Sequence, residues 1–194
     1  MQLRVVLLTT CILLTGCKPG GKNESPDEKP NNTLQANSPT TPPMNTTADT
    51  PRPTEDIKPG KAYELVQDGA IYLDVRSVSE FTQSHPADAY NVPIIIFGDD
   101  GQRDKNGNFL EIVKANFSPK TPIVCGCKSG MRSSMAADML AEAGFEQVYN
   151  MVGGMGGAKV DGESVPGWEA AGLPVESGEG GSKSYAALKS DSHD

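Results

Sequence analysis

Residues 127–133 read Cys-Lys-Ser-Gly-Met-Arg-Ser and lie between a short apolar run, residues 122–125, and a segment of helical character, residues 133–143. The apolar run predicts a buried strand and the second segment predicts a helix. Cys127 would then lie where backbone N–H groups converge at a helix N-terminus, a position that stabilises anions and lowers the pKa of a thiol. The stretch therefore predicts a nucleophilic thiolate in an anion-binding loop.

The residues around Cys127 have different expected roles. Arg132 suits an oxyanion through its planar guanidinium, or holds the carbonyls of its own loop, and both roles stay open. Lys128 either attracts an anion or is solvated. Ser133 is predicted to cap the following helix, and Gly130 to supply a backbone angle that other residues resist. We expect the anion-binding loop to comprise Lys128, Ser129, Gly130, Met131, Arg132 and Ser133.

Strand-like and helix-like segments alternate along the chain, which predicts an α/β domain with a parallel sheet. The active loop would then lie at the carboxyl end of a strand, where open α/β sheets bind ligands. Expected strands are residues 70–73, 90–96, 123–124 and 147–152; expected helices are 59–67, one after a Ser77–Glu80 capping box, 109–117, and 133–143 with Met135, Met139, Leu140 and Ala143 on its apolar face.

The Cys127 loop resembles the active-site loop of rhodanese-type sulfurtransferases, and the resemblance covers about residues 57–176 in order. It implies a single domain with a rhodanese-like open parallel sheet flanked by helices. Ser84 and Asp88 stand where the family usually has glycine, and Cys125 is an extra thiol. The matching stretches are 72–76 with Glu80 and Phe81, 84–93, 150–154, and Trp168 with 172–175.

The resemblance implies a sulfurtransferase of the thiosulfate:cyanide type. Cys127 would attack the outer sulfur of a small anionic donor such as thiosulfate, hold that sulfur as a persulfide, and pass it to a thiol or a cyanide-like acceptor. No cofactor is implied. We expect no metal site, because a zinc ion would need two ligands beyond the Cys125–Cys127 pair. His85 is expected to have a structural role in a turn.

Two neighbouring groups of residues have structural interpretations. Asp74, Arg76 and Glu80 are predicted to form an ion-pair and capping arrangement beneath the active loop rather than an acid/base cluster. Residues 153–157 read Gly-Gly-Met-Gly-Gly, a spacing that does not fit a dinucleotide fingerprint. They predict a mobile loop that borders the pocket.

Three other functions compete with sulfur transfer. A thiol redox protein would cycle Cys125 and Cys127, although a Cys-x-Cys bridge closes a small strained ring. A non-catalytic module would carry sulfur or bind a partner. A phosphatase of the cell-cycle type would need five residues between cysteine and arginine, whereas four separate Cys127 from Arg132.

The N-terminus predicts export and lipidation. A short basic start precedes an apolar stretch, residues 5–14, that is too short to span a membrane. Residues 14–17, Leu-Thr-Gly-Cys, resemble a bacterial lipobox. We expect a lipoprotein signal peptide over 1–16 that includes Cys11, lipidation of Cys17, and anchoring to the inner or outer membrane of a bacterial cell envelope. An ordinary secretory signal is the alternative.

The composition of the chain also predicts where the folded domain begins and ends. Residues 17–56 predict a disordered Pro/Thr/Asn-rich tether, residues 57–176 the domain, and residues 177–194 a disordered tail, although 185–188 could form a short docking element. The 194-residue chain has a formal net charge of −8. Nucleic acid is therefore not an expected partner, because phosphate backbones require a basic surface.

Overall fold

A computed structural model describes residues 54–98 and 101–192 of the chain. All of them belong to one compact unit, residues 46–194. The expected signal peptide, Cys17 and nearly all of the expected tether lie outside the described residues, as do the last two residues of the tail.

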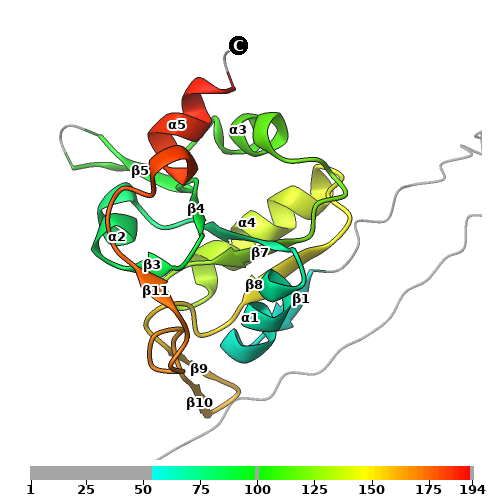
Figure 1. Ribbon diagram of the computed structural model, residues 1–194, viewed down its shortest axis with the longest axis vertical. Helices are drawn as coiled ribbons and strands as arrows, with labels where there is room; N and C mark the ends of the chain where they lie inside the picture. Colours follow the sequence, from blue (N-terminus) through cyan, green and yellow to red (C-terminus); the bar gives the residue numbers. More distant parts are fainter. Residues whose placement is uncertain (1–53, 99–100, 193–194) are drawn as a thin grey trace, which may run out of the picture. The chain divides into compact units, whose positions relative to one another are not determined.

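A five-stranded parallel sheet forms the centre of the unit, in the order β1-β8-β7-β2-β4 (Figure 1). From β2 the strand order continues toward one edge of the sheet, to β4. From β7 it continues toward the opposite edge, to β8. The strand order therefore reverses between β2 and β7, which is where open α/β sheets bind ligands. The strands are β1 (Glu55–Ile57), β2 (Ile71–Asp74), β4 (Tyr90–Asn91), β7 (Ile123–Gly126) and β8 (Val148–Met151).

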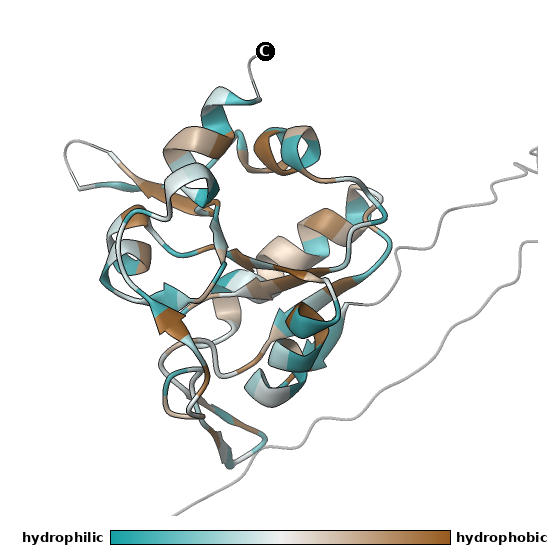
Figure 2. Cartoon of the chain, in the orientation of Figure 1, coloured by the Kyte–Doolittle hydropathy of each residue, from teal (hydrophilic) through white to brown (hydrophobic). Residues whose placement is uncertain are grey.

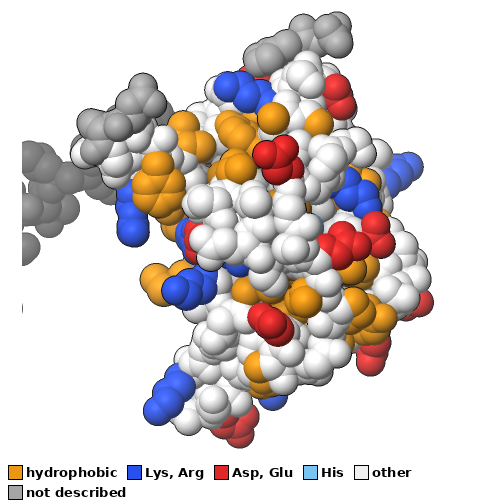
Figure 3. Space-filling model, turned by 60° about the vertical axis from the view of Figure 1, so that its left-hand side comes forward, with side chains coloured by type: hydrophobic (Ala, Val, Ile, Leu, Met, Phe, Trp, Pro, Cys, Tyr) orange, Lys and Arg blue, Asp and Glu red, His pale blue; other side chains and the backbone are white. Residues whose placement is uncertain are grey.

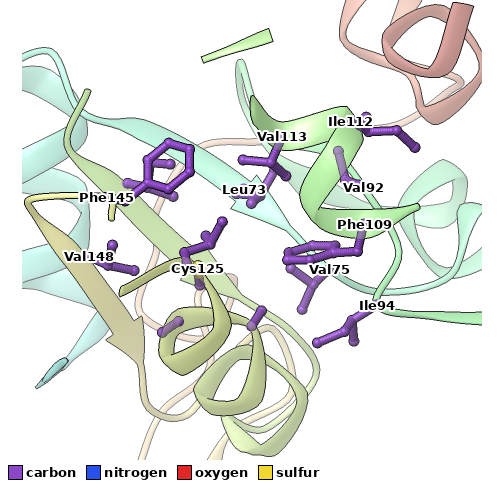
Figure 4. Packing of buried hydrophobic residues seen from close by; sticks show 14 of the residues in the cluster. Leu73, Val75, Val92, Ile94, Phe109, Ile112, Val113, Cys125, Phe145 and Val148 are labelled. Atoms are coloured by element: carbon purple, nitrogen blue, oxygen red, sulfur yellow. The ribbon is translucent and has the colours of Figure 1, made fainter. Parts of the chain in front are cut away.

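Two apolar layers cover the sheet because successive strand residues point to opposite faces. Leu73 and Cys125 belong to a layer that includes residues of α3 (Phe109–Asn116), α4 (Met131–Glu142) and α5 (Tyr185–Ser190) (Figures 1 and 4). Tyr72, Val124 and Trp168 belong to the other layer, with α1 (Pro59–Gln67) and Phe81 of α2 (Val78–Gln83). The flanking helices carry both hydrophobic and hydrophilic residues, whereas β7 is hydrophobic along most of its length (Figure 2). The chain thus has the predicted α/β class and the predicted parallel sheet flanked by helices.

Three antiparallel pairs and one short helical turn extend this core. The pair β5–β6 projects beside α2, and β3–β11 joins the C-terminal part of the chain to the segment after α2. Their bounds are β3 (His85–Pro86) with β11 (Val175–Glu176), β5 (Ile95–Phe97) with β6 (Arg103–Lys105), β9 (Ala158–Val160) with β10 (Glu163–Val165), and the 3-10 turn η1 (Gly181–Lys183).

Several predicted elements need correction. The expected strand 90–96 is divided into β4 and β5, because Pro93 lacks the N–H that a sheet ladder needs and β5 pairs with β6 instead. α4 begins at Met131, so it starts two residues before the predicted position. Its N-cap is Gly130 and not the predicted Ser133, which lies within the first turn and donates its hydroxyl to the Gly130 carbonyl. Its buried face is formed by Ser133, Ala136, Ala137 and Leu140, whereas Met135 is 46% exposed.

The predicted domain boundaries were too narrow at both ends. Glu55 and Asp56, assigned to the tether, form β1 and pair with β8. The tail, expected to be disordered, contains η1 and α5, and Leu188 of α5 is only 3% exposed within the α3 layer. The Asn116 amide donates to the Leu188 carbonyl at 2.9 Å. Residues 185–188, which the sequence allowed to form a short docking element, belong to α5.

Among residues 54–98 and 101–192, none of the helices combines the length and the apolar character that crossing a bilayer requires.

Candidate active site

The Cys127 loop begins where β7 ends, at the carboxyl edge of the sheet. Gly126 allows the chain to pass the Tyr72 side chain, since a Cβ at this position would collide with the phenol. Gly130 precedes the first turn of α4 with a φ of 113°, the backbone angle that was predicted for it. Cys127 lies between these glycines and is 1% exposed. The sulfur is therefore held in a tight turn between strand and helix.

Hydrogen-bond donors surround the Cys127 sulfur. The Gly130 N–H donates to Sγ at 3.1 Å, and the Ser133 hydroxyl lies 3.4 Å from it. Burial raises the pKa of Cys127. The Ser133 hydroxyl and the N–H groups of Ser133, Ser129 and Gly130 outweigh burial, and the net pKa lies below the ordinary thiol value. These donors are the kind of environment that the predicted thiolate requires.

The glycine-rich segment 153–157 holds the outer side of the loop. The Met155 N–H donates to the Cys127 carbonyl at 2.9 Å, and the Gly156 N–H donates to the Lys128 carbonyl at 2.8 Å. A Cβ on Gly154 would collide with both carbonyl groups. The segment predicted to be a mobile loop is thus hydrogen-bonded directly to the backbone of Cys127 and Lys128.

The Arg132 guanidinium forms a two-bond fork with Glu80. Its Nη1 and Nη2 donate to Oε2 and Oε1 at 2.7 Å and 2.8 Å. The Arg132 contact holds the pKa of Glu80 down at about 2, and the Ser77 backbone N–H contributes. Glu80 completes the predicted capping box of α2 with Ser77. Arg132 therefore joins the active loop to α2, which differs from both of its predicted roles.

A second ion pair lies under the site, as predicted. Arg76 Nη2 contacts Asp74 Oδ2 at 2.6 Å, and Arg76 also donates to the Ser84 carbonyl at 2.7 Å. Asp74 is fully buried and Arg76 nearly so. These residues fix the turn after β2, which faces the Cys127 loop across the point where the strand order reverses.

Lys128 lines two small cavities that open beside the loop. One, of about 380 Å³, is bordered by Phe97, Arg103 and Arg132, and the other, of about 220 Å³, by Met155. Within the described part of the chain, no ion pair involves the exposed Lys128. Figure 3 shows hydrophobic and Lys/Arg side chains side by side along the left-hand edge of the face drawn. The Arg103 guanidinium lies 5.6 Å from the Phe97 ring centroid.

The remaining predicted residues have structural roles. Cys125 is fully buried, and burial together with the nearby Cys127 raises the pKa of its thiol, as expected for an inert cysteine. His85 is also buried; its Nδ1 lies 2.7 Å from the Phe81 carbonyl and its ring stacks on Phe81. Asp88, which stands where the family usually has glycine, has a left-handed backbone with a φ of 65°, and its carboxylate contacts Lys183 at 2.6 Å.

Two site residues were missed in the sequence. Asn150 lies in β8 beside Asp56 of β1, and its side chain contacts the Ser133 hydroxyl next to Cys127. The only signal was that Asn150 falls within a family-like stretch. Among the described residues, no cluster of His, Cys, Asp and Glu side chains is suited to hold a metal ion.

A profile of the rhodanese-like domain matches residues 58–159, more than half of the 194-residue chain. The chain belongs to the rhodanese-like domain family. This match begins just before α1, ends within β9 and includes the whole Cys127 loop.

Relatives of this rhodanese-like chain include named enzymes. It is 39% identical over 115 residues to thiosulfate sulfurtransferase 16 of Arabidopsis thaliana, covering 59% of this chain and 87% of the relative. It is 32% identical over 123 residues to thiosulfate sulfurtransferase GlpE of Haemophilus influenzae, covering 63% and 94%. The crystal structure of Rv0390 from M. tuberculosis matches with a TM-score of 0.53 and 31% identity, over 64% of this chain and 98% of that one.

Proposed function

We propose that the protein is a sulfurtransferase that moves a sulfane sulfur from a thiosulfate-like anion to a thiophilic acceptor through a persulfide on Cys127. The observation that supports this most directly is the set of N–H and hydroxyl donors directed at the Cys127 sulfur, which stabilise a thiolate without a general base. The named relatives that are thiosulfate sulfurtransferases support the same reaction class.

Both half-reactions balance without an external oxidant or reductant. The Cys127 thiolate attacks the outer sulfur of thiosulfate, the S–S bond breaks, and sulfite leaves with the bonding electron pair. The persulfide anion then occupies the same loop. A thiol or cyanide attacks its terminal sulfur, and the electron pair of the broken S–S bond returns to Cys127. Lys128 lies at the cavities through which an anionic donor would approach.

Intact mass after incubation with thiosulfate tests this proposal. We expect a gain of about one sulfur atom, removed by cyanide with formation of thiocyanate, in the natural chain and in Cys125→Ser. Cys127→Ser should abolish both the adduct and turnover. Equal loss in the two variants, or loss of two hydrogens across Cys125 and Cys127 in place of a sulfur adduct, would contradict the single-thiol mechanism. The raised pKa of Cys125 makes that redox outcome unexpected, since a protonated thiol is a poor exchange partner.

We further propose that this activity is attached to a bacterial envelope membrane through lipid on Cys17. The Leu-Thr-Gly-Cys stretch at residues 14–17 supports the anchor, and the proline-rich residues that follow support a spacer with a typical reach of about 35 Å. We expect the mature N-terminus to be a diacylglyceryl-modified Cys17 by mass spectrometry. Cys17→Ala should move the protein from the membrane fraction to the soluble fraction. An unmodified N-terminus at another residue would support an ordinary secretory signal instead.

A further inference from the structure

The Ser133 hydroxyl has three acceptors within reach but only one hydrogen to donate. Its Oγ lies 2.7 Å from Asn150 Oδ1, 3.0 Å from the Gly130 carbonyl and 3.4 Å from Cys127 Sγ. A serine hydroxyl donates one hydrogen bond at a time and accepts others. Ser133 is completely buried, so no solvent competes for that hydrogen. The three acceptors therefore compete with one another.

The orientation of the Asn150 amide is fixed from its other end. Its Nδ2 donates to Asp56 Oδ1 at 2.8 Å, and an ionised carboxylate can only accept. The NH₂ group must therefore face Asp56, which turns the carbonyl oxygen toward Ser133. The register of β1 on β8 places Asp56 directly beside Asn150, and Asn150 is only 3% exposed. The amide is thus a permanent acceptor for the Ser133 hydrogen.

The Cys127 sulfur places different demands on Ser133 in its two charge states. A protonated thiol can donate to Ser133 Oγ while the hydroxyl donates to Asn150. A thiolate or persulfide anion has no hydrogen to give and is stabilised only if the hydroxyl turns toward it. We propose that Asn150, oriented by Asp56, is a positioning residue that competes with the Cys127 sulfur for the Ser133 hydrogen and so limits how strongly the loop holds a sulfur anion.

For sulfur transfer, which rests on the proposed function above, this competition matters in the second half-reaction. An anion bound too tightly by its donors is a poor sulfur donor, because an interaction that favours the intermediate over the transition state slows release. The backbone N–H groups give a constant stabilisation. The Ser133 hydroxyl is the variable donor, because it can donate either to the sulfur or to Asn150. Asn150 therefore sets how often the hydroxyl donates to the sulfur.

Other ionisable groups also interact with the Cys127 sulfur. The Asn150 substitution tested below leaves these residues in place. Tyr72 of β2, Cys125 of β7 and Arg132 of α4 each interact electrostatically with Cys127. Lys128 follows it directly in the loop. Asp56 is connected to the sulfur by a chain of hydrogen bonds that runs through Asn150 and Ser133.

The deciding experiment is the pH dependence of iodoacetamide alkylation at Cys127 in the full chain, read in the tryptic peptide 121–128 with the modified cysteine localised by fragmentation. We expect Asn150→Leu to lower the midpoint by roughly 0.5–1 pH unit, the effect of one freed hydrogen bond. Asn116→Leu is the matched control, since this amide also makes two side-chain hydrogen bonds, one to the Ile112 carbonyl within α3 and one to the Leu188 carbonyl of α5. It should not move the midpoint.

The direction of the shift separates competition from mere loosening. A loosened loop would lose its N–H donors and raise the midpoint, whereas release of the Ser133 hydrogen lowers it. Ser133→Ala should raise the midpoint, and adding Asn150→Leu to it should change nothing more. If Asn150→Leu fails to fold, Asp56→Ala replaces it, since Asp56 is exposed. Without Asp56 the Asn150 amide can turn its NH₂ toward Ser133 and no longer accepts the Ser133 hydrogen. The midpoint should therefore fall in this variant as well.

A midpoint that rises or stays unchanged in the deciding variant would overturn the proposal. A downward shift that persists in the Ser133→Ala background would overturn it as well, since the effect would not pass through the hydroxyl. Alkylation requires no donor, acceptor or turnover. Failure of this inference is therefore distinguishable from failure of the proposed sulfur transfer.

Discussion

At the residue scale, Cys127 is stabilised by hydrogen-bond donors rather than by a free neighbouring cation. The charge of Arg132 is engaged by both oxygens of Glu80, and the donors to the sulfur are backbone N–H groups and one hydroxyl. Such donors are fixed in direction and buried, so salt screens them weakly. Thiolate formation at this site should depend on the shape of the loop more than on ionic strength.

The Glu80–Arg132 fork predicts an acid-sensitive contribution to stability. Because the pKa of Glu80 is lowered from 4.5 to about 2, its contribution is present above pH 4.5 and is lost as the pH falls toward 2. We expect Glu80→Gln to reduce the free energy of unfolding by about 1–2 kcal/mol at pH 7, and the difference from the natural chain to shrink toward pH 2. Urea unfolding across this range measures it.

Glu64→Gln is the matched control for that prediction. Glu64 also pairs with a cation, Lys61, but its side chain is 67% exposed, against 30% for Glu80. The control should change stability by less than about 0.5 kcal/mol at any pH. A Glu80→Gln deficit that stayed constant down to pH 2 would contradict the role assigned to the fork.

Residue roles were predictable where their partners are close in sequence. Cys127, Gly130 and the Ser77–Glu80 capping box all lie within short motifs whose geometry follows from local rules. The partner of Arg132 was not predictable, because Glu80 is 52 residues away. Asn150 and Asp56 are 94 residues apart and meet only through strand register.

At the element scale, the segment 153–157 is a support for the active loop. Gly154 has a φ of 52°, and a Cβ added to it would collide with the Cys127 and Lys128 carbonyls. We expect Gly154→Ala to lower the free energy of unfolding by about 1–3 kcal/mol more than backbone strain alone, because an added methyl group has no room. It should also slow alkylation of Cys127 about tenfold, since displaced carbonyls would disturb the donors around the sulfur.

Gly162→Ala measures the cost of backbone strain without a steric collision. Gly162 has a φ of 85° with open space where a Cβ would go, so this variant carries the left-handed backbone cost without the collision. Unfolding by urea and alkylation kinetics on both variants give the comparison. Equal effects would show that 153–157 does not support the loop.

Elements with strong local signals were predicted well, and those decided by packing were not. α1 has the predicted bounds, with proline in its first turn. The division of 90–96 into β4 and β5 depends on a hairpin partner, β6, that contains only charged residues and shows no strand pattern. The buried face of α4 uses small side chains close to the sheet, which a search for large apolar residues overlooks.

At the scale of the whole unit, the C-terminal segment closes the fold rather than trailing from it. β11 pairs with β3, the Gly178 N–H donates to the Thr82 carbonyl, and α5 packs on α3. We expect Leu188→Ala to cost about 2–4 kcal/mol in urea unfolding, the range for truncating a buried leucine. Lys189→Ala, exposed on the same helix, should cost less than about 0.5 kcal/mol. Similar small effects would mean that α5 is dispensable.

The pairing of β1 with β8 also has a consequence for biosynthesis. The first strand of the sheet must wait for a partner that is made more than ninety residues later, which takes about 5–20 s at ordinary rates of translation. Cys125 and Cys127 are made before β8, so both thiols lack their buried surroundings while the sheet is incomplete. We therefore expect both cysteines to be more open to oxidation in a chain that still lacks β8 than in the complete fold, where each is at most 1% exposed.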